Sequence, residues 1–187
     1  MQTTSLYIEM IILGAEVATW ILTIFSAIDD KVVLYLEKGF SYDALAAVVF
    51  LCLCYVLGIL CDRFADWVFS GYEQRIKAIH LGECSDVITY QVWHEEGRDS
   101  YYEFVMSHKR IIRGTVLNAL PIAVAFAVYA MLDGFSTALL AALLVSGVVV
   151  CVFCRKIYAH LLNGYYKNVK KYWDAQQKKS YAPDHQN

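Results

Sequence analysis

The sequence lacks the short motifs that identify a catalytic or nucleotide-binding loop through their mechanism. It contains no Walker loop, no dinucleotide-binding glycine pattern, no GxSxG nucleophile turn and no HExxH zinc motif. His94 is followed by two glutamates but not by a second histidine at the required spacing, and the five histidines are scattered along the chain. Without a motif that has a mechanism, we expect the chain not to be an enzyme.

Cysteine pairs are also missing from the places where a disulfide or a metal would use them. Of the six cysteines, only Cys84 lies in a polar segment; the others lie in or at the ends of apolar stretches. Cys52 and Cys54 point to different sides of a helix. Cys151 and Cys154 share a face, but no further His or Cys pair completes a tetrahedral site. We therefore expect no disulfide framework, no metal and no cofactor, and interpret the cysteines as small apolar helix residues.

Apolar residues are abundant and make up 58% of the chain, against about 45–50% in a typical soluble domain. They gather in four stretches, at about 7–28, 44–61, 116–132 and 135–154. Each stretch has about the 17–25 residues with which a helix crosses ~30 Å of hydrocarbon. The first has no basic segment before it and no small-residue cleavage site after it, so we expect a membrane helix rather than a signal peptide. The fold class predicted is all-α, with four transmembrane helices.

The lysines and arginines fall almost entirely on one side of these stretches. Of the 16 Lys and Arg residues, only Lys31 and Lys38 lie between the first and second stretches, and none lies between the third and fourth. All the others lie within 62–115 or from residue 155 onward. The positive-inside rule therefore places both of these segments in the cytoplasm, and four crossings place the N-terminus there as well.

The helices are predicted to extend past the membrane into a cytoplasmic helical cap made of residues 62–115 and 155–175. In both segments apolar residues recur at spacings of three and four, which is typical of amphipathic helices. The cap is marginal for an independent domain, so we expect residues 1–187 to form a single membrane domain. Residues 176–187 are polar and are predicted to form a disordered tail.

A stripe of polar residues follows one face of the first stretch. Its members recur at helical spacing: Glu9, Glu16, Thr19, Thr23 and Ser26. Glu16 lies about 10 Å deeper than Glu9, where a charged carboxyl group costs about 2.5–3.5 kcal/mol. One interpretation is that a ring of protomers, most simply a tetramer, lines a cation-favouring pore with this stripe. The other is a structural acid that hydrogen-bonds Asn118, Tyr55 or Tyr129 within one protomer.

Two basic clusters are candidates for contact with a ligand or with lipid. The first consists of Lys109, Arg110 and Arg113, and the second of Lys167, Lys170 and Lys171 with Tyr172 and Trp173. Both could lie against anionic membrane lipid. They could instead bind the phosphates of a nucleotide or oligonucleotide, with Tyr165, Tyr166, Tyr172 and Trp173 stacking on the bases.

Asp62, Arg63 and Asp66 lie where the second stretch enters the cap. Asp62 and Asp66 are four residues apart and share a helix face, so they repel each other unless a cation lies between them. Arg110 or Arg113 on the returning helix is within reach. We therefore favour a structural ion pair here over a metal site.

Two segments resemble a family of small uncharacterised bacterial membrane proteins, which carry an Asp-Arg element after one span and a basic-apolar element before the next. The segments are 57–75, with Gly58, Asp62, Arg63 and Asp66, and 107–118, with His108, Arg110, Arg113 and Asn118. The overall plan is similar to transmembrane effectors of bacterial anti-phage systems, which form oligomeric channels controlled by a nucleotide, an oligonucleotide or a partner protein. The resemblance implies an effector or channel of the bacterial inner membrane, gated through its cap. The alternatives are an adaptor or scaffold that docks a soluble partner, and a small transporter.

Overall fold

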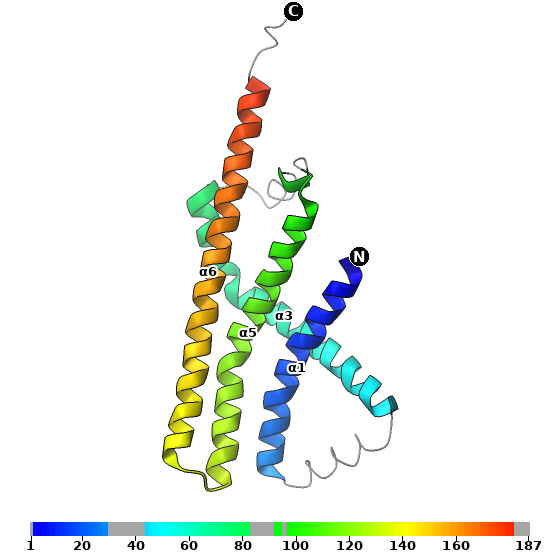
Figure 1. The fold of residues 1–187 in the computed structure, drawn as a ribbon, viewed down its shortest axis with the longest axis vertical. Coiled ribbons are helices and arrows are strands. Elements are labelled where there is room, and N and C mark those ends of the chain that lie inside the picture. Colours follow the sequence, from blue (N-terminus) through cyan, green and yellow to red (C-terminus); the bar gives the residue numbers. More distant parts are fainter. Residues whose placement is uncertain (1, 30–43, 83–91, 95–96, 182–187) are drawn as a thin grey trace, which may run out of the picture.

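The computed structural model describes residues 2–29, 44–82, 92–94 and 97–181, with side chains from 6 to 175 within those ranges. Its long helices are α1 (Gln2–Ile28), α3 (Ala44–Leu81), α5 (Asp99–Leu132) and α6 (Thr137–Tyr181) (Figure 1). All four are long and apolar enough to cross a membrane. The expected all-α fold with four candidate spans is confirmed, and it suggests a multi-pass membrane protein.

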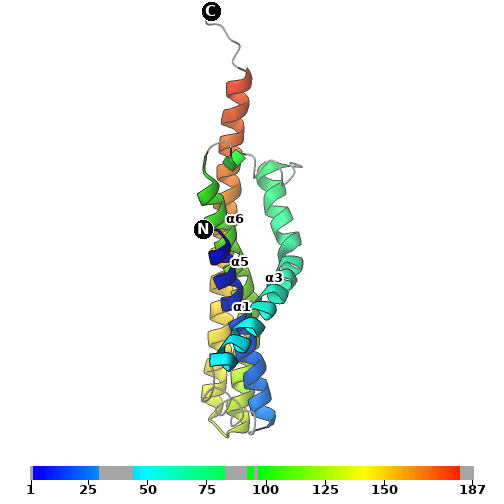
Figure 2. The same cartoon turned by 90° about the vertical axis from the view of Figure 1, so that its right-hand side faces the viewer.

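The helices alternate in direction, so that α1 begins and α6 ends toward the same end of the molecule (Figure 1). The turn between α5 and α6 lies at the opposite end. Within the described residues, α5 packs against all three other long helices, whereas α1 packs only against α3 and α5. Figure 2 shows α3 crossing α1 obliquely. The later part of α3 contacts α6, where His80 Nε2 lies 3.0 Å from Asn163 Oδ1. The helix α3 also packs against the three others, so α3 and α5 together connect α1 to α6.

A glycine with positive φ ends α5 and allows the chain to reverse. Gly134 has φ 75°, and the N–H of the next residue, Phe135, donates to the Ala130 carbonyl at 3.0 Å. Helix α6 begins at Thr137. The carbonyl of the preceding Ser136 accepts hydrogen bonds from the N–H groups of Leu139 and Leu140. Phe135, expected at the start of the fourth span, thus lies in the turn. The apolar pattern did not separate it from the helix because a turn can also contain an apolar residue.

Three of the helices run well past the apolar stretches without interruption. The helix α3 ends at Leu81, and α5 begins at Asp99. Helix α6 continues to Tyr181, beyond residue 175, where the cap was expected to end. Gln and Lys are good helix formers, and residues 165–182 contain no glycine or proline. Residues 182–187 lie outside the described part of the chain.

These extensions pack around a core rich in aromatic rings, which we call the aromatic core. Trp93 is 1% exposed, and its ring centroid lies 4.9 Å from that of Tyr101 and 6.0 Å from that of Tyr165. Tyr158 of α6 is fully buried against Phe69 of α3. Further buried members are Ile76, Val105, Leu162, Tyr166 and Val169. Because α3, α5 and α6 all contribute, their extensions form one packed unit.

Within the apolar part, α1 and α3 meet backbone to backbone at glycines. A Cβ on Gly14 would lie 1.5 Å from the carbonyl oxygen of Cys54, and a Cβ on Gly58 would lie 1.8 Å from that of Met10. Gly114 of α5 likewise leaves room for an α1 leucine side chain. Only glycine allows such close approach, so the crossing is determined by these positions.

Candidate functional site

Arg113 is the most deeply placed cation on α5 and binds two acids of α3. It is 5% exposed; its Nη2 donates to Asp62 at 2.8 Å and its Nη1 donates to Asp66 at 2.5 Å. The sequence suggested Arg110 or Arg113 for this role, and in the structure Arg113 takes it. Arg63 is exposed and lies outside this arrangement. One guanidinium therefore offsets the repulsion between two carboxylates on the same helix face.

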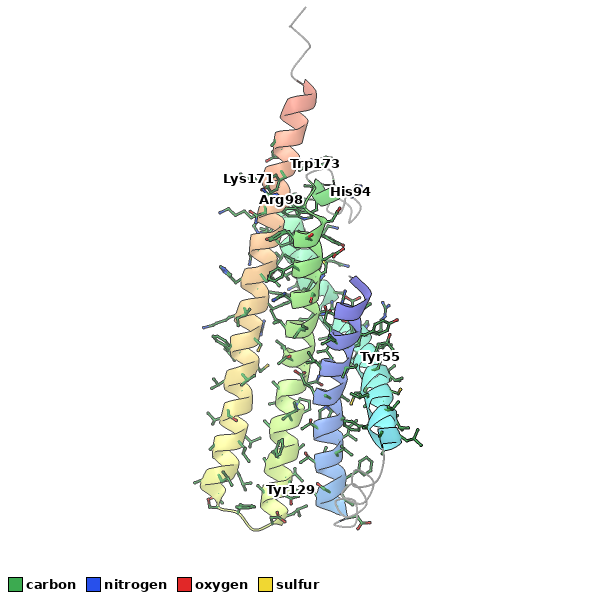
Figure 3. All side chains as sticks on the ribbon, turned by 45° about the vertical axis from the view of Figure 1, so that its right-hand side comes forward. Tyr55, His94, Arg98, Tyr129, Lys171 and Trp173 are labelled. Carbon is green, nitrogen blue, oxygen red and sulfur yellow. The ribbon has the colours of Figure 1, made fainter. Side chains whose placement is uncertain are left out.

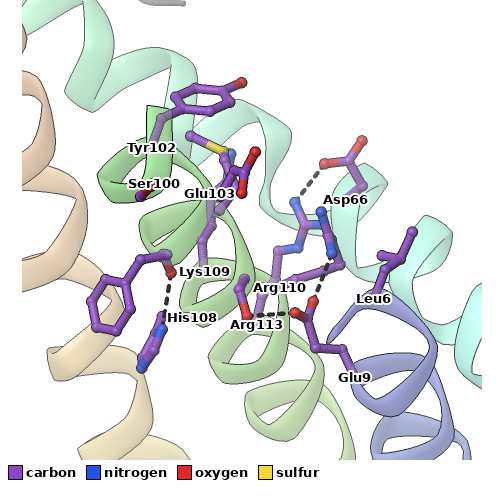
Figure 4. A pocket seen from close by; sticks show the side chains of 13 residues that line it. Leu6, Glu9, Asp66, Ser100, Tyr102, Glu103, His108, Lys109, Arg110 and Arg113 are labelled. Carbon is purple, nitrogen blue, oxygen red and sulfur yellow. Dashed lines mark hydrogen bonds and ion pairs between the residues drawn. The ribbon is translucent and has the colours of Figure 1, made fainter. Parts of the chain in front are cut away.

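Arg110 binds the buried acid of α1. Glu9 is 4% exposed, and its carboxylate accepts hydrogen bonds from Arg110 Nη1 at 2.6 Å and from the Ser107 hydroxyl at 2.5 Å (Figure 4). Glu9, predicted as a pore-lining candidate, thus lies between α1 and α5. Removing Arg110 would take the cation away from a buried carboxylate, so this pair holds the start of α1 against α5.

Lys109 completes the set of cations and connects three helices. Its Nζ donates to Glu73 of α3, and the Tyr166 hydroxyl of α6 donates to the same carboxylate oxygen at 3.0 Å.

Tyr158 lies beyond the fourth apolar stretch. Burial and the Glu73 carboxylate raise the pKa of its phenol, and Arg113 acts in the opposite direction. The phenol therefore stays protonated at neutral pH.

A cavity of about 740 Å³ opens beside these ion pairs (Figure 4). Its charged and titratable lining carries both signs: Glu9, Asp66, Glu103, His108, Lys109, Arg110 and Arg113. A second cavity, of about 460 Å³, shares Asp66 and Lys109 with it. The three cations already bind acids, but arginine has five N–H donors and lysine three, and Arg113 Nε has no hydrogen-bond partner among the described residues. An anionic ligand in the first cavity would therefore compete with the carboxylates for the same cations.

Deeper along α1, Glu16 contacts α5 through neutral donors. The Thr115 hydroxyl donates to its Oε1 at 2.8 Å, and Asn118 Nδ2 donates to its Oε2 at 3.1 Å. Asn118 is one of the three partners that the sequence suggested. Tyr55 instead packs against the ring of Tyr7 with centroids 5.4 Å apart, and Tyr129 lies toward the α5–α6 turn (Figure 3).

The remaining polar residues of the α1 stripe bond within their own helix. The hydroxyls of Thr19, Thr23 and Ser26 donate to backbone carbonyls three or four residues earlier, at 2.7–2.9 Å. Thr19 is exposed on the single chain, and Thr23 and Ser26 are half-buried. A polar path along this stripe would therefore have to form between protomers, and the pore itself stays a prediction.

The second basic cluster lies at the far end of α6, away from Tyr129 (Figure 3). Lys167, Lys170 and Lys171 are exposed. At 1.5 Å per residue, Lys167 lies about 20 Å along the helix from the end of the fourth apolar stretch. Contact of this cluster with anionic lipid or with a soluble anionic partner stays a prediction.

The aromatic residues expected to stack on nucleotide bases are mostly occupied within the chain. Tyr165 and Tyr166 are 2% and 3% exposed in the aromatic core, so they are not available for stacking. Tyr172 packs edge-on against Trp93 with centroids 5.4 Å apart. The Arg98 guanidinium carbon lies 5.1 Å from the Tyr172 ring centroid, in a cation–π contact. Trp173 is half-buried.

Comparison with known proteins adds no assignment to this geometry. No protein-family model, no curated protein and no solved structure matches the chain, so the resemblance to small bacterial membrane proteins stays a prediction. Within the described residues, no group of three or more His, Cys, Asp or Glu is placed to hold a metal ion. The site is therefore characterised by its ion pairs alone.

Several contacts of this site were not anticipated from the sequence. Glu73 accepts hydrogen bonds from Lys109 and from the Tyr166 hydroxyl. The Ser107 and Thr115 hydroxyls donate to Glu9 and Glu16, the two acids of α1. Ser107 lies three residues before Arg110, and Thr115 lies three residues before Asn118. This spacing puts each pair on one face of α5, so the polar face of α5 could have indicated these contacts.

Proposed function

We propose that the protein is an oligomeric membrane effector or ion channel that is gated through a cytoplasmic helical cap. A homo-tetramer is the favoured assembly, because a polar path along α1 requires neighbouring protomers. The observation that carries the proposal is that α5 binds α1 and α3 through three cations, beside a large cavity. A change in the cap can reach the membrane helices through these contacts.

The mechanism follows from the continuity of α5 and α6 across both parts of the chain. A rearrangement around the aromatic core would shift the start of α5 and strain the contact between Arg110 and Glu9. Release of Glu9 would free α1, which carries the proposed pore stripe, and opening would let ions cross and depolarise the cell. A ligand drives this change only if its affinity differs between the two states. In keeping with the resemblance, we propose a nucleotide, oligonucleotide or partner-protein signal in bacterial anti-phage defence.

Ion flux through purified protein tests the channel. We expect liposomes that contain the wild-type chain to conduct, and Arg110→Glu to change the flux severalfold because it opposes the buried Glu9 charge. Arg63→Glu is the matched control, since this exposed arginine lies outside the ion pairs. Membrane potential in expressing cells, with and without phage infection, gives the second readout. If neither assay detects a current for any variant, the channel is rejected.

The oligomer has its own test. Chemical cross-linking in mild detergent, followed by mass measurement of the particle, should give a closed assembly with four copies as the leading outcome. A strictly monomeric particle would remove the ring pore, because one protomer does not surround the α1 stripe.

The second candidate function is a non-channel adaptor that docks a soluble partner on the exposed Lys167, Lys170 and Lys171. Changing these three lysines to glutamate separates the two functions. For a channel with a signal-binding cap, the triple variant retains flux in liposomes but loses its effect in cells. For an adaptor, the effect in cells disappears although no flux was ever present. A small transporter would instead move solute without sustained current.

A further inference from the structure

Glu16 differs from the other acids at the helix contacts in having no cation beside it among the described residues. Glu9, Asp62, Asp66 and Glu73 each bind an arginine or lysine of α5. The partners of Glu16 are Thr115 and Asn118, which are neutral. A charged carboxylate in an apolar span costs about 2.5–3.5 kcal/mol. A cation supplied from outside the chain would offset that cost.

The two hydrogen bonds that Glu16 accepts do not use the full acceptor capacity of its carboxylate. Each carboxylate oxygen accepts along two directions, about four in all. Thr115 uses one direction on Oε1, and Asn118 uses one on Oε2. One acceptor direction per oxygen therefore stays open for an N–H donor, whose charge would make the new bonds short and strong.

An apolar crevice adjoins Glu16 between α5 and α6. It has a volume of about 230 Å³, and Glu16 lines it together with Ile122, Phe126, Leu143 and Val150. This volume is below the ~300–1,000 Å³ of pockets that hold drug-sized ligands, so a single ring or a short alkyl chain fits. A hard inorganic cation such as Ca²⁺ prefers six to eight oxygen ligands, which this lining does not offer.

We propose that Glu16 and this crevice bind a small amphipathic organic cation, namely a primary or secondary ammonium that carries one aromatic ring or a short alkyl chain. The ammonium donates to the Glu16 carboxylate, and the apolar body lies between α5 and α6. The α6 wall is exposed on the outside of the single chain, with Val150 at 44%. A ligand dissolved in the hydrocarbon layer can therefore enter sideways. The inference does not depend on the proposed channel.

Fluorine NMR of the purified full chain in nanodiscs of zwitterionic lipid tests the site. The probe is 4-(trifluoromethyl)benzylamine, and the matched neutral probe is 4-(trifluoromethyl)benzyl alcohol, which partitions into lipid but carries no charge. We expect saturable broadening of the amine signal, reversed by excess unlabelled benzylamine, and only non-saturable broadening of the alcohol signal. Empty nanodiscs give the lipid background for both probes.

Two variants separate charge recognition from simple partitioning. Glu16→Gln keeps the shape and one acceptor oxygen, so the protein should still fold, and we expect amine affinity to fall at least tenfold. Ser146→Phe fills the crevice from the α6 side and should weaken binding while Glu16 is retained. Equal binding of amine and alcohol, or unchanged amine binding to Glu16→Gln, overturns the proposal. A protein that conducts ions but does not bind the amine overturns this inference alone; one that binds without conducting overturns only the channel.

Discussion

Gly14 and Gly58 occupy reciprocal positions in the crossing of α1 and α3. Gly14 faces the backbone of Cys54, which lies one helical turn before Gly58, and Gly58 faces the backbone of Met10, which lies one turn before Gly14. Each glycine thus makes room for the turn that precedes the other. The two helices can approach this closely only while both positions lack a side chain.

The first prediction is that Gly14→Ala or Gly58→Ala destabilises the protein although alanine is the better helix former. The added Cβ would overlap backbone carbonyl atoms, which cannot move aside as a flexible side chain could. We expect a cost above about 2 kcal/mol, measured by thermal unfolding in detergent. Gly71→Ala on the same α3 is the control: no atom lies near its Cβ position, so it should be neutral or stabilise by up to about 1 kcal/mol. Equal effects at all three positions would refute the close crossing.

The second prediction concerns Arg113, which holds Asp62 and Asp66. Arg113→Met should cost about 3 kcal/mol, toward the lower end of the ~3–5 kcal/mol for breaking a buried pair, because Asp66 is largely exposed. Adding Asp62→Asn to Arg113→Met should recover part of the loss, and a double-mutant cycle measures that coupling. Arg63→Met, at an exposed position, should change stability by less than about 0.5 kcal/mol. Strict additivity in the cycle would argue against the pair.

The third prediction is that Trp93 anchors the aromatic core. Trp93→Ala removes a fully buried ring and should cost about 3–5 kcal/mol. Protease cleavage of the α3 and α5 extensions should increase at the same time, since the residues around Trp93 connect both to α6. Trp67, which is 73% exposed on α3, serves as the control, and Trp67→Ala should leave the cleavage pattern unchanged. Identical cleavage of both variants would show that Trp93 does not hold the extensions together.

The fourth prediction is the orientation in the membrane. In a variant free of native cysteines, Asp133→Cys in the α5–α6 turn should react with a membrane-impermeant maleimide added to intact spheroplasts. Lys167→Cys on the α6 extension should react only after permeabilisation, because the positive-inside rule places that end in the cytoplasm. Labelling of both positions from the same side would contradict four crossings, and the reversed pattern would contradict the orientation.

The helices themselves could be predicted from the sequence because long apolar runs and spacings of three and four report directly on local structure. The same spacing placed Asp62 and Asp66 on one face and suggested Arg110 or Arg113 as their partner. Periodicity states which residues share a face but not which helix that face meets. The separate assignments of Arg110 to Glu9 and Arg113 to Asp62 therefore appear only in the structure.

The contacts that the sequence did not predict depend on tertiary packing. Gly14 lies within an apolar run. Its sequence context does not show that the backbone of another helix lies against it. The sequence suggested that Tyr166 could stack on a nucleotide base; in the structure the Tyr166 ring is buried and its hydroxyl donates to Glu73. In both cases the surroundings of the residue are formed by a helix that is distant in the sequence, so a local sequence pattern does not predict them.

The distribution of partners along the chain also has a consequence for synthesis. Both acids of α1 bind residues of α5 that follow 98 to 102 positions later. Ribosomes add roughly 5–20 residues per second, so α1 is made about 5–20 s before its partners exist. During that interval Glu9 and Glu16 lack every contact described above. We therefore expect α1 to reach its final packing only after α5 has been made.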